Sequence, residues 1–226
     1  MRKIFMSEKQ SARALRARAL VRCLKKLYPK PKTELQYTTD FQLVVAVILS
    51  AQCTDKKVNE VTISLFKKYK NPKDFANAVP VDFQKAISSI SFFRNKTKSI
   101  IGSAKMVVEV YGGNVPKNEK ELVQLPGVGY KTAHVILGEL FDIWEGIATD
   151  THVRRFALRF DLTDNKDLTK ISKDLEKLIP KKDWRYVNNG FVLYGRHVCP
   201  AHPHECKNHP LSKVWREAEN RWPKAK

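Results

Sequence analysis

The sequence lacks the features of a membrane or secreted protein. No uncharged apolar run approaches the roughly 20 residues that span a bilayer, and the longest apolar stretch, at 41–51, suits a core helix. The first ten residues are basic but have few apolar residues before Ser7, so a secretory signal lacks its apolar segment. The sequence therefore predicts a cytoplasmic protein, associated with the nucleoid if its source is prokaryotic.

Cysteine is also scarce. The four cysteines of this 226-residue chain, Cys23, Cys53, Cys199 and Cys206, are too few and too unevenly spaced for a disulfide scaffold. Low-complexity tracts, internal repeats and long linkers are absent as well. The chain is long enough to bury a substantial core, as one large domain or as two small ones.

Acidic residues are few compared with basic ones. Asp and Glu number 23 against 42 Lys and Arg, which gives a formal net charge of +19 at pH 7. Such a charge attracts a polyanion, and nucleic acid is the leading partner. A solvated surface or an anionic membrane would explain the charge equally well, so charge alone does not choose the partner.

Strand signals are missing, and apolar residues recur at helical spacing in nearly every segment. The stretch 41–49 is apolar around its whole circumference apart from Gln42, which predicts a helix enclosed by other helices. Thr39 and Asp40 are its candidate N-caps. Gly112 and Gly113 are predicted to end another helix, which runs from about Lys96. The sequence therefore predicts an all-α fold.

The most informative segment lies at 119–140. A short helix ending at Leu125 is followed by a Pro-Gly-Val-Gly turn and by a second helix from about Tyr130. Two glycines around one small apolar residue let the backbone turn tightly and point N–H groups outward, and the helix start adds its positive dipole end. This helix-hairpin-helix pattern is suited to binding a DNA phosphate, although a tight corner between two helices that binds no ligand would have the same sequence pattern. The candidate phosphate contacts are Gly127, Val128, Gly129 and Thr132.

Two motifs then point to a family. The segments LPGVGYKTAHVIL at 125–137 and ATDTHVRRF at 148–156 resemble the endonuclease III family of helix-hairpin-helix DNA glycosylases. Similar segments in family order cover most of residues 20–210. In that family a lysine just after the hairpin and an aspartate before Thr-His carry the chemistry, which implies Lys131 and Asp150 as the catalytic residues.

A lysine suits this chemistry because its neutral amine can attack the sugar C1′, displace the damaged base and hold the sugar as a Schiff base for β-elimination. Burial and a helix N-terminus, which both favour the neutral amine, are expected around Lys131. The resemblance implies that Asp150 stabilises the charge that develops on the sugar and relays protons. Without the joint motif, Lys131 would be a solvated phosphate-binding lysine and Asp150 a helix N-cap.

Two residues are candidates for filling the space of an extruded nucleotide, since an enzyme that acts on a base within a duplex must flip it out. Gln52 matches the family residue that enters this gap, although it could be an ordinary helix-end glutamine. Phe92 is the candidate apolar wedge, in a loop where Ser91 replaces a family glycine. For Phe93, core packing is a serious alternative.

Other polar positions carry weaker signals. His152 resembles a family histidine near the DNA backbone, and Arg154 and Arg155 add charge on the same helix, although a solvated helical face would explain the arginines. Asp55 resembles a family position beside the pocket. An aspartate after Thr54 is also typical of a helix N-terminus.

The C-terminal segment departs from the family, which commonly carries a four-iron cluster on four cysteines. Cys199 and Cys206 match the first pair, whereas His209 and Trp215 occupy the third and fourth positions. Because a standard cluster requires four thiolates, the sequence predicts that no iron–sulfur cluster is bound.

Zinc is a less favoured alternative for the same segment. Two Cys-x-x-His units, Cys199 with His202 and Cys206 with His209, offer sulfur and nitrogen ligands, and His204 is an additional candidate. A relic of a lost cluster need bind nothing, so we expect a metal-free loop. Packing would then hold it, through Trp215, Trp222, Pro203 and Pro210.

Taken together, the sequence predicts two helical domains, 33–145 with the hairpin and 1–32 plus 146–226. The resemblance implies a monomeric glycosylase and abasic-site lyase that removes oxidised pyrimidines from duplex DNA without a nucleotide cofactor or catalytic metal. A monofunctional mismatch or adenine glycosylase would carry another residue at position 131. A non-catalytic helix-hairpin-helix protein would explain the charge and the hairpin but not the pair of Lys131 and Asp150.

Overall fold

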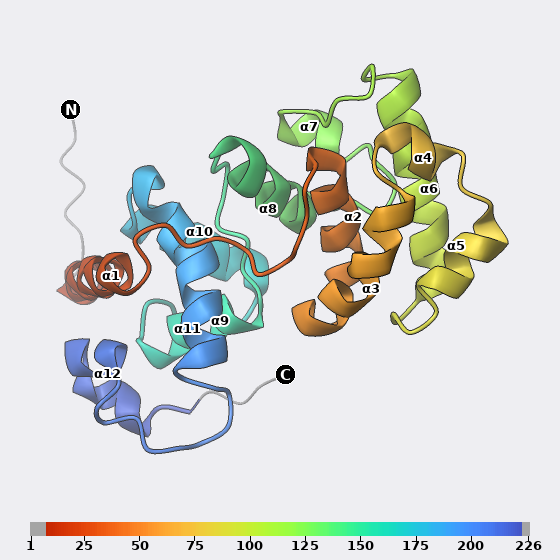
Figure 1. Ribbon diagram of the computed structural model, residues 1–226. Helices are drawn as coiled ribbons and strands as arrows, with labels where there is room; N and C mark the ends of the chain where they lie inside the picture. Colours follow the sequence, from red (N-terminus) through yellow and green to blue (C-terminus); the bar gives the residue numbers. More distant parts are fainter. Residues whose placement is uncertain (1–7, 223–226) are drawn as a thin grey trace, which may run out of the picture. The chain divides into compact units, whose positions relative to one another are not determined.

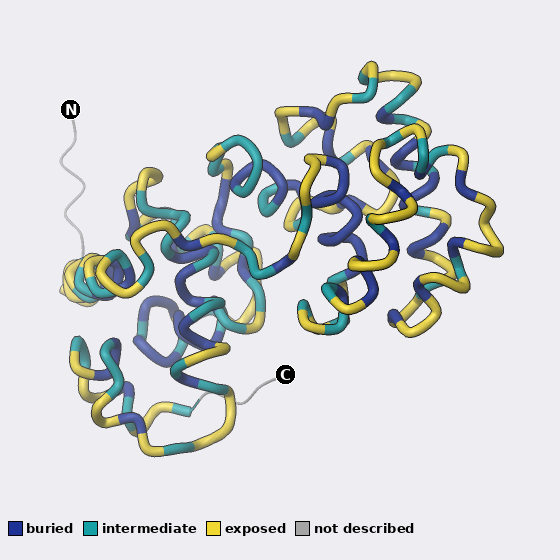
Figure 2. The backbone as a smooth tube through the Cα atoms, in the orientation of Figure 1, coloured by how far each residue is buried: buried dark blue, intermediate teal, exposed yellow. Residues whose placement is uncertain are grey.

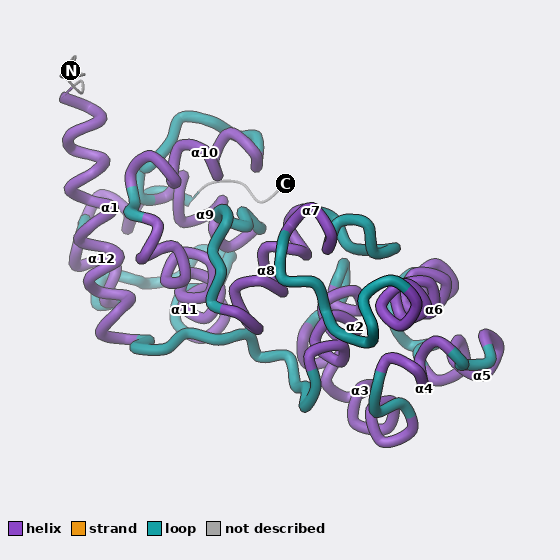
Figure 3. The backbone as a smooth tube through the Cα atoms, turned by 90° about the horizontal axis from the view of Figure 1, so that it is seen from above, coloured by secondary structure: helices purple, strands orange, loops and turns teal. Residues whose placement is uncertain are grey.

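The computed structural model describes residues 8–222, and every regular element in that range is helical (Figure 1, Figure 3). No strand occurs between residues 8 and 222, so the predicted all-α fold is confirmed. None of the helices in this range is both long and apolar enough to cross a membrane. The chain divides into two compact units, one from Thr33 to Glu145 and one formed by the segments on either side of it.

The unit from Thr33 to Glu145 is built around one buried helix. Its helices are α2 (Asp40–Ser50), α3 (Asp55–Lys68), α4 (Pro72–Ala76), α5 (Pro80–Ala86), α6 (Phe93–Glu109), α7 (Glu119–Leu122) and α8 (Tyr130–Phe141). Every residue of α2 from Phe41 to Leu49 is buried, and α3, α6 and α8 pack around it. The enclosed helix is thus confirmed. Its N-cap is Thr39, whose side chain accepts a hydrogen bond from the backbone N–H of Gln42.

Glycines stop the long helix α6 where the sequence predicts. Gly112 and Gly113 follow its end with φ angles of 60° and 87°, which cost a glycine little. The N–H of Gly113 donates to the carbonyl of Val107 at 2.8 Å, and this bond closes the helix end. The helix begins at Phe93, three residues before the predicted start near Lys96.

In the other unit, the segments before Thr33 and after Glu145 share one hydrophobic core (Figure 2). Its helices are α1 (Glu8–Leu27), α9 (Thr151–Arg159), α10 (Leu168–Leu178), α11 (Phe191–His197) and α12 (Pro210–Val214), with short 3₁₀ helices η1 (Lys181–Asp183) and η3 (Arg216–Asn220) and a π-helical turn η2 (Tyr186–Gly190). Leu20 and Leu24 of α1 are buried, and α1 packs against α10, α12 and η2. The rings of Phe156 and Phe191 stack with their centroids 5.2 Å apart. The N-terminal helix therefore completes a core that is otherwise made by the last third of the chain.

Candidate active site and nucleic-acid interface

The hairpin turn between α7 and α8 requires glycine at one position. Gly127 has φ of 83°, and a Cβ built there would lie 2.7 Å from the Cβ of Ser99. Both facts exclude a side chain without movement of the backbone. Two hydrogen bonds fix the turn. The hydroxyl of Ser103, on α6, donates to the carbonyl of Pro126 at 2.7 Å, and the N–H of Val128 donates to the carbonyl of Leu125 at 3.0 Å.

The first helix of the hairpin is shorter than the sequence predicts. Helix α7 ends at Leu122, and the chain reaches Leu125 through successive turns instead of a continued helix. A contact between the two helices compensates for this short length, because the carboxylate of Glu119 pairs with the imidazole Nε2 of His134. The hairpin is therefore braced on both sides of its glycine turn.

The turn leads directly into the N-terminus of α8. Gly129 is the N-cap, so the cap residue has no side chain that could accept from the first backbone N–H groups of this helix. These N–H groups and the helix dipole make an electropositive end that suits an anion. Lys131 and Thr132 lie in the same first turn, Lys131 exposed and Thr132 half-buried. The helix start expected around Lys131 is present. The expected burial is not seen, because Lys131 is exposed in the part of the chain that the structure describes.

Asp150 is the N-cap of α9, in the other unit. Its Oδ1 accepts a hydrogen bond from the backbone N–H of Val153 at 2.8 Å, and its side chain is half-buried. The capping interpretation of Asp150 is therefore confirmed. This role leaves its second carboxylate oxygen available for other chemistry.

Side chains from η2 and α10 hold the segment 146–148, which leads to Asp150. The Oδ1 of Asn188 accepts from the N–H of Ala148 at 2.7 Å, and its Nδ2 donates to the carbonyl of Gly146 at 3.2 Å. The hydroxyl of Ser172 donates to the carbonyl of Ile147 at 2.7 Å. Asn188 and Ser172, which the sequence analysis missed, thus fix the approach to Asp150.

Gln52 and Phe92 share an uncommon backbone conformation. Their φ angles are 56° and 57°, in the left-handed region that non-glycine residues rarely occupy. Such strain is often found at functional positions. Both side chains belong to exposed residues, and that of Phe92 is 59% exposed. Phe93, by contrast, packs against the hydrophobic core, as the alternative interpretation held.

Lys96 connects the loops that carry these two residues. It lies one turn into α6, and its buried ammonium donates to the carbonyls of Leu49 and Ala51 at the C-terminus of α2. Burial lowers the pKa of Lys96, with Cys53 acting in the opposite direction. No sequence motif assigns a role to Lys96. Its position on the buried stripe of α6, four residues before Ile100, was the available signal.

The remaining polar candidates occupy structural positions. Asp55 is the first residue of α3 behind the N-cap Thr54, which confirms the helix-start interpretation. Arg155 is buried rather than part of a solvated face, so that interpretation was wrong for this residue. It donates to the carbonyl of Cys199 at 2.6 Å, and its other terminal nitrogen lies 3.2 Å from Nδ1 of His152.

A buried guanidinium lies between the two cysteines of the C-terminal loop. Arg159 is fully buried and donates to the Sγ of Cys199 at 2.8 Å and to the Sγ of Cys206 at 2.7 Å. Burial raises the pKa of Cys199, an effect that Arg159 opposes. A four-iron cluster needs four thiolates and room between them. The two thiols and the intervening arginine do not fit that group.

Two tryptophans pack against arginines in the same unit. Trp222 stacks over Arg159 with its ring centroid 3.9 Å from the guanidinium carbon, and Trp215 stacks in the same way over Arg16 at 4.3 Å. Three ligand-type atoms also gather here, one each from Cys199, His204 and His209. His202 and Cys206 lie outside this group and His204 belongs to it, so the group keeps two of the four zinc ligands that the Cys-x-x-His spacing suggested.

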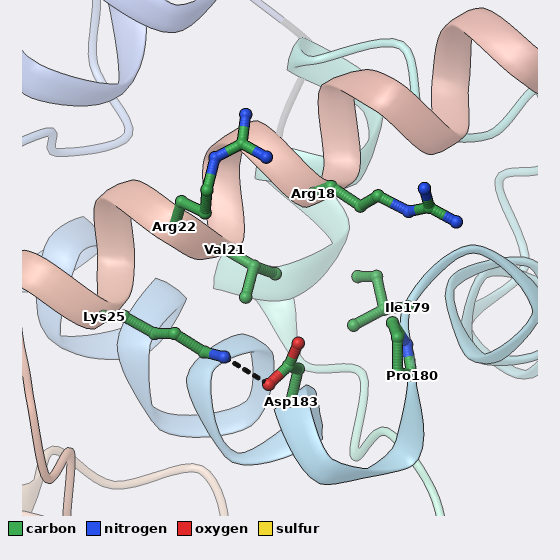
Figure 4. A pocket seen from close by; sticks show the side chains of 7 residues that line it. All are labelled: Arg18, Val21, Arg22, Lys25, Ile179, Pro180 and Asp183. Atoms are coloured by element: carbon green, nitrogen blue, oxygen red, sulfur yellow. Dashed lines mark ion pairs between the residues drawn. The ribbon is translucent and has the colours of Figure 1, made fainter.

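A hollow of about 240 Å³ lies beside α1 (Figure 4). Its lining residues are Arg18, Val21, Arg22, Lys25, Ile179, Pro180 and Asp183. The ammonium of Lys25 forms an ion pair with Asp183 at 2.6 Å, and Val21 and Ile179 supply apolar walls. None of the residues implied in catalysis borders this hollow, so it is separate from the candidate active site.

The amino-acid sequence is similar to those of known DNA repair proteins. The HhH-GPD superfamily base excision DNA repair protein family matches residues 45–181. Endonuclease III of Bacillus subtilis strain 168 is 44% identical over 204 residues, which cover 88% of this chain and 92% of that protein. Endonuclease III of a Synechocystis species is 41% identical over 211 residues, covering 93% of this chain and 96% of that protein.

Solved structures show the same relationship. The protein in a non-covalent endonuclease III–DNA complex matches with a TM-score of 0.82 and 36% identity, over 96% of this chain and 99% of that chain. A thermostable thymine-DNA glycosylase matches with a TM-score of 0.77 at 20% identity, over 92% and 98% of the two chains, which shows a shared fold alone. The chain therefore belongs to the HhH-GPD superfamily of base excision DNA repair proteins and, within it, to the endonuclease III family.

Proposed function

We propose that this DNA glycosylase is bifunctional: it removes oxidised pyrimidines from duplex DNA and cleaves the resulting abasic strand through a Schiff base on Lys131. The observation that carries the proposal is the place of Lys131. It is an exposed amine in the first turn of α8, directly after the glycine turn and beside N–H groups that no side chain caps. A phosphate held by those N–H groups would bring the neighbouring sugar to the lysine.

The proposed reaction has two stages. The neutral amine of Lys131 attacks C1′, and the glycosidic bond breaks so that the base leaves with the bonding electrons and gains a proton. The ring then opens to an imine between Nζ and C1′. Loss of a proton from C2′ expels the 3′ phosphate, which cleaves the strand, and water releases the sugar from the lysine.

Asp150 would act as the carboxylate of this reaction. A carboxylate near C1′ stabilises the positive charge on the sugar as the base departs, and it can accept and return the protons of the amine. Its cap to Val153 and the bonds from Asn188 to the preceding backbone restrict its movement. A positioned carboxylate needs no reorganisation as charge develops.

The hairpin would hold the DNA strand through backbone and side-chain groups. Gly127 and Gly129 offer their backbone N–H groups in the turn, and Thr132 adds a hydroxyl in the first turn of α8. The N–H of Val128 already donates to Leu125, so Val128 would contribute by shaping the turn. His152, in the first turn of α9, would contact the DNA backbone. The net charge of +19 favours such phosphate contacts.

Gln52 and Phe92 would fill the duplex where the damaged nucleotide has left. Both sit at strained, exposed positions at the ends of helices, where a side chain can project into a groove. Insertion of an apolar ring compensates in part for the stacking that extrusion removes.

We also propose that the enzyme works without an iron–sulfur cluster or a nucleotide cofactor. Two thiols, a histidine and a tryptophan stand where the cluster needs four thiolates, and Arg159 lies between the thiols. All proposed chemical steps use side chains of the chain itself.

Trapping with borohydride tests the central claim. A duplex with one abasic site should give a covalent adduct with the wild-type protein, because borohydride reduces the imine to a stable amine. Lys131→Ala should give none, whereas Lys120→Ala, which removes an exposed lysine of the neighbouring α7, should trap normally. Adduct formation by Lys131→Ala at the wild-type level would contradict the assignment.

Two other results would favour the alternatives. Base release with strand cleavage only after alkali would indicate a monofunctional glycosylase. Binding of damaged duplex without base release from any of a panel of oxidised pyrimidines would indicate a non-catalytic protein. The same panel identifies the preferred lesion and opposite base.

A further inference from the structure

The loop between α11 and α12 brings together a thiol and two imidazoles. One ligand-type atom from each of Cys199, His204 and His209 lies within 4.8 Å of the other two. Cys199 is buried, and both histidines are half-buried. These residues come from an 11-residue stretch that follows α11, so their convergence depends on the path of the loop.

The tautomer of His204 is fixed by a backbone contact. Its Nδ1 lies 2.8 Å from the carbonyl oxygen of His202, and because a carbonyl can only accept, Nδ1 carries the hydrogen. The lone pair is then on Nε2. A bond of this kind from one ring nitrogen is what orients a metal-binding histidine in proteins.

One ring nitrogen of each histidine is buried without a hydrogen-bond partner among the described residues. Nε2 of His204 and Nδ1 of His209 are buried and make no hydrogen bond within residues 8–222. Buried polar atoms in native proteins are nearly always satisfied, so each such atom calls for an explanation such as an ion. Both atoms belong to the histidines that lie close to the sulfur of Cys199.

We propose that this loop binds one zinc ion through Sγ of Cys199, Nε2 of His204 and Nδ1 of His209. Mixed thiolate and imidazole ligands suit zinc, and three protein ligands leave a fourth position for water. Tetrahedral ligands at about 2.0–2.3 Å from zinc lie roughly 3.5 Å apart, so the three atoms would need to close by about 1 Å.

Cys206 stays outside this ligand set. Its sulfur accepts from Arg159, which also donates to Cys199. Arg159 therefore acts as the outer donor that orients a thiolate ligand, while Cys206 anchors the other side of the guanidinium. His202 contributes its backbone carbonyl, and its exposed side chain is not needed.

Such an ion would tie the loop to the helix that Asp150 caps. Arg155 and Arg159 of α9 already bind the carbonyl and the sulfur of Cys199. Zinc would close the loop at His204 and His209 onto the same residue. The inference does not depend on the chemistry of Lys131.

Metal analysis of the untagged, full-length protein tests the proposal. We expect about one zinc per chain and no stoichiometric iron. Cys199→Ser, His204→Ala and His209→Ala should each reduce zinc at least tenfold, while the matched variant His202→Ala retains it. Cys206→Ser should also retain zinc. Reconstitution of the metal-free protein with cobalt(II) should give the visible bands of a tetrahedral site with a thiolate ligand.

A measurement on the wild-type protein covers the case of variants that do not fold. Removal of zinc with a chelator should lower Tm by roughly 5 °C or more, and added zinc should restore it. A wild-type protein without zinc, with no cobalt spectrum and an unchanged Tm, would overturn the proposal. Loss of zinc from His202→Ala but not from His204→Ala would overturn the ligand set. Borohydride trapping, measured in parallel, reports separately on Lys131.

Discussion

The ammonium of Lys96 lies 2.6 Å from the carbonyl oxygen of Ala51, the residue that precedes Gln52. A second bond, at 2.8 Å, reaches the carbonyl of Leu49. Both carbonyls belong to the C-terminal end of α2, where the helix dipole favours a cation. Because Lys96 is in the first turns of α6, one side chain sets the distance between the Gln52 loop and the Phe92 loop.

Replacement of this lysine should therefore affect both loops. Lys96→Met keeps the length of the side chain but leaves two carbonyls unpaired, and we expect it to lower the free energy of unfolding by about 1–3 kcal/mol. Binding of damaged duplex should weaken by roughly tenfold, about 1.4 kcal/mol. Lys98→Met removes the same charge from an exposed position of α6 and should leave stability within about 0.5 kcal/mol of wild type. Equal effects of the two variants would show that charge, not the bonds of Lys96, is responsible.

Two glycines of the hairpin should respond differently to alanine. Gly127→Ala forces a Cβ against Ser99 at a φ of 83°, so we expect it to reduce stability by about 2 kcal/mol or more. Gly129 has φ of −92° and no heavy atom within 4 Å of a built Cβ. Gly129→Ala should therefore unfold at nearly the wild-type denaturant concentration. A stable Gly127→Ala variant would contradict the proposed constraint on the turn.

Substitutions of Asp150 can separate its capping role from its proposed chemical role. Asn is as good an N-cap as Asp, so Asp150→Asn should keep the stability of the protein while base release falls by at least about 100-fold. Asp150→Ala should lose activity and, in addition, about 1 kcal/mol of stability.

Asp167 provides the matched control, because it caps α10 through the N–H of Lys170 in the same way. Asp167→Asn should leave both stability and base release unchanged. If Asp150→Asn also released base at the wild-type rate, Asp150 would be a cap and nothing more.

Acid should remove one ion-pair contribution to stability. Hydrogen bonds from Arg13 and then Lys9 lower the pKa of Asp164 from 3.8 to about 2. A lowered carboxyl pKa stabilises the folded state above the unfolded pKa, and this contribution disappears as the pH falls from about 4 toward 2. The carboxylate of Asp164 is largely exposed, so its contribution to the free energy of unfolding should be below about 1 kcal/mol. Urea unfolding of wild type and Asp164→Asn should differ near neutral pH and converge near pH 2.

Patterns that repeat along the chain were sufficient to predict much of the fold. The enclosed helix α2, its cap Thr39 and the glycine stop after α6 all follow from local rules of periodicity and capping. The helix-hairpin-helix was also predicted, since its glycines have a local cause. Local rules were less accurate for α7, where turns replaced the last residues of the predicted helix.

Residues whose role depends on distant partners could not be predicted in this way. Lys96 and Arg155 resemble surface cations in sequence, yet both are buried because backbone carbonyls from other segments accept their hydrogen bonds. Likewise, the spacing of Cys-x-x-His suggested His202, whereas the loop path brings His204 to Cys199. Sequence spacing gives the candidates, and the path of the backbone decides among them.

The division of the chain also has a consequence for the order of folding during synthesis. Helix α1 is synthesised before the unit from Thr33 to Glu145, but its buried residues Leu20 and Leu24 pack against segments that are synthesised only after Glu145. The unit from Thr33 to Glu145 has its own core and can fold as soon as it has left the ribosome. The apolar face of α1 therefore stays exposed to solvent until the last third of the chain has been synthesised.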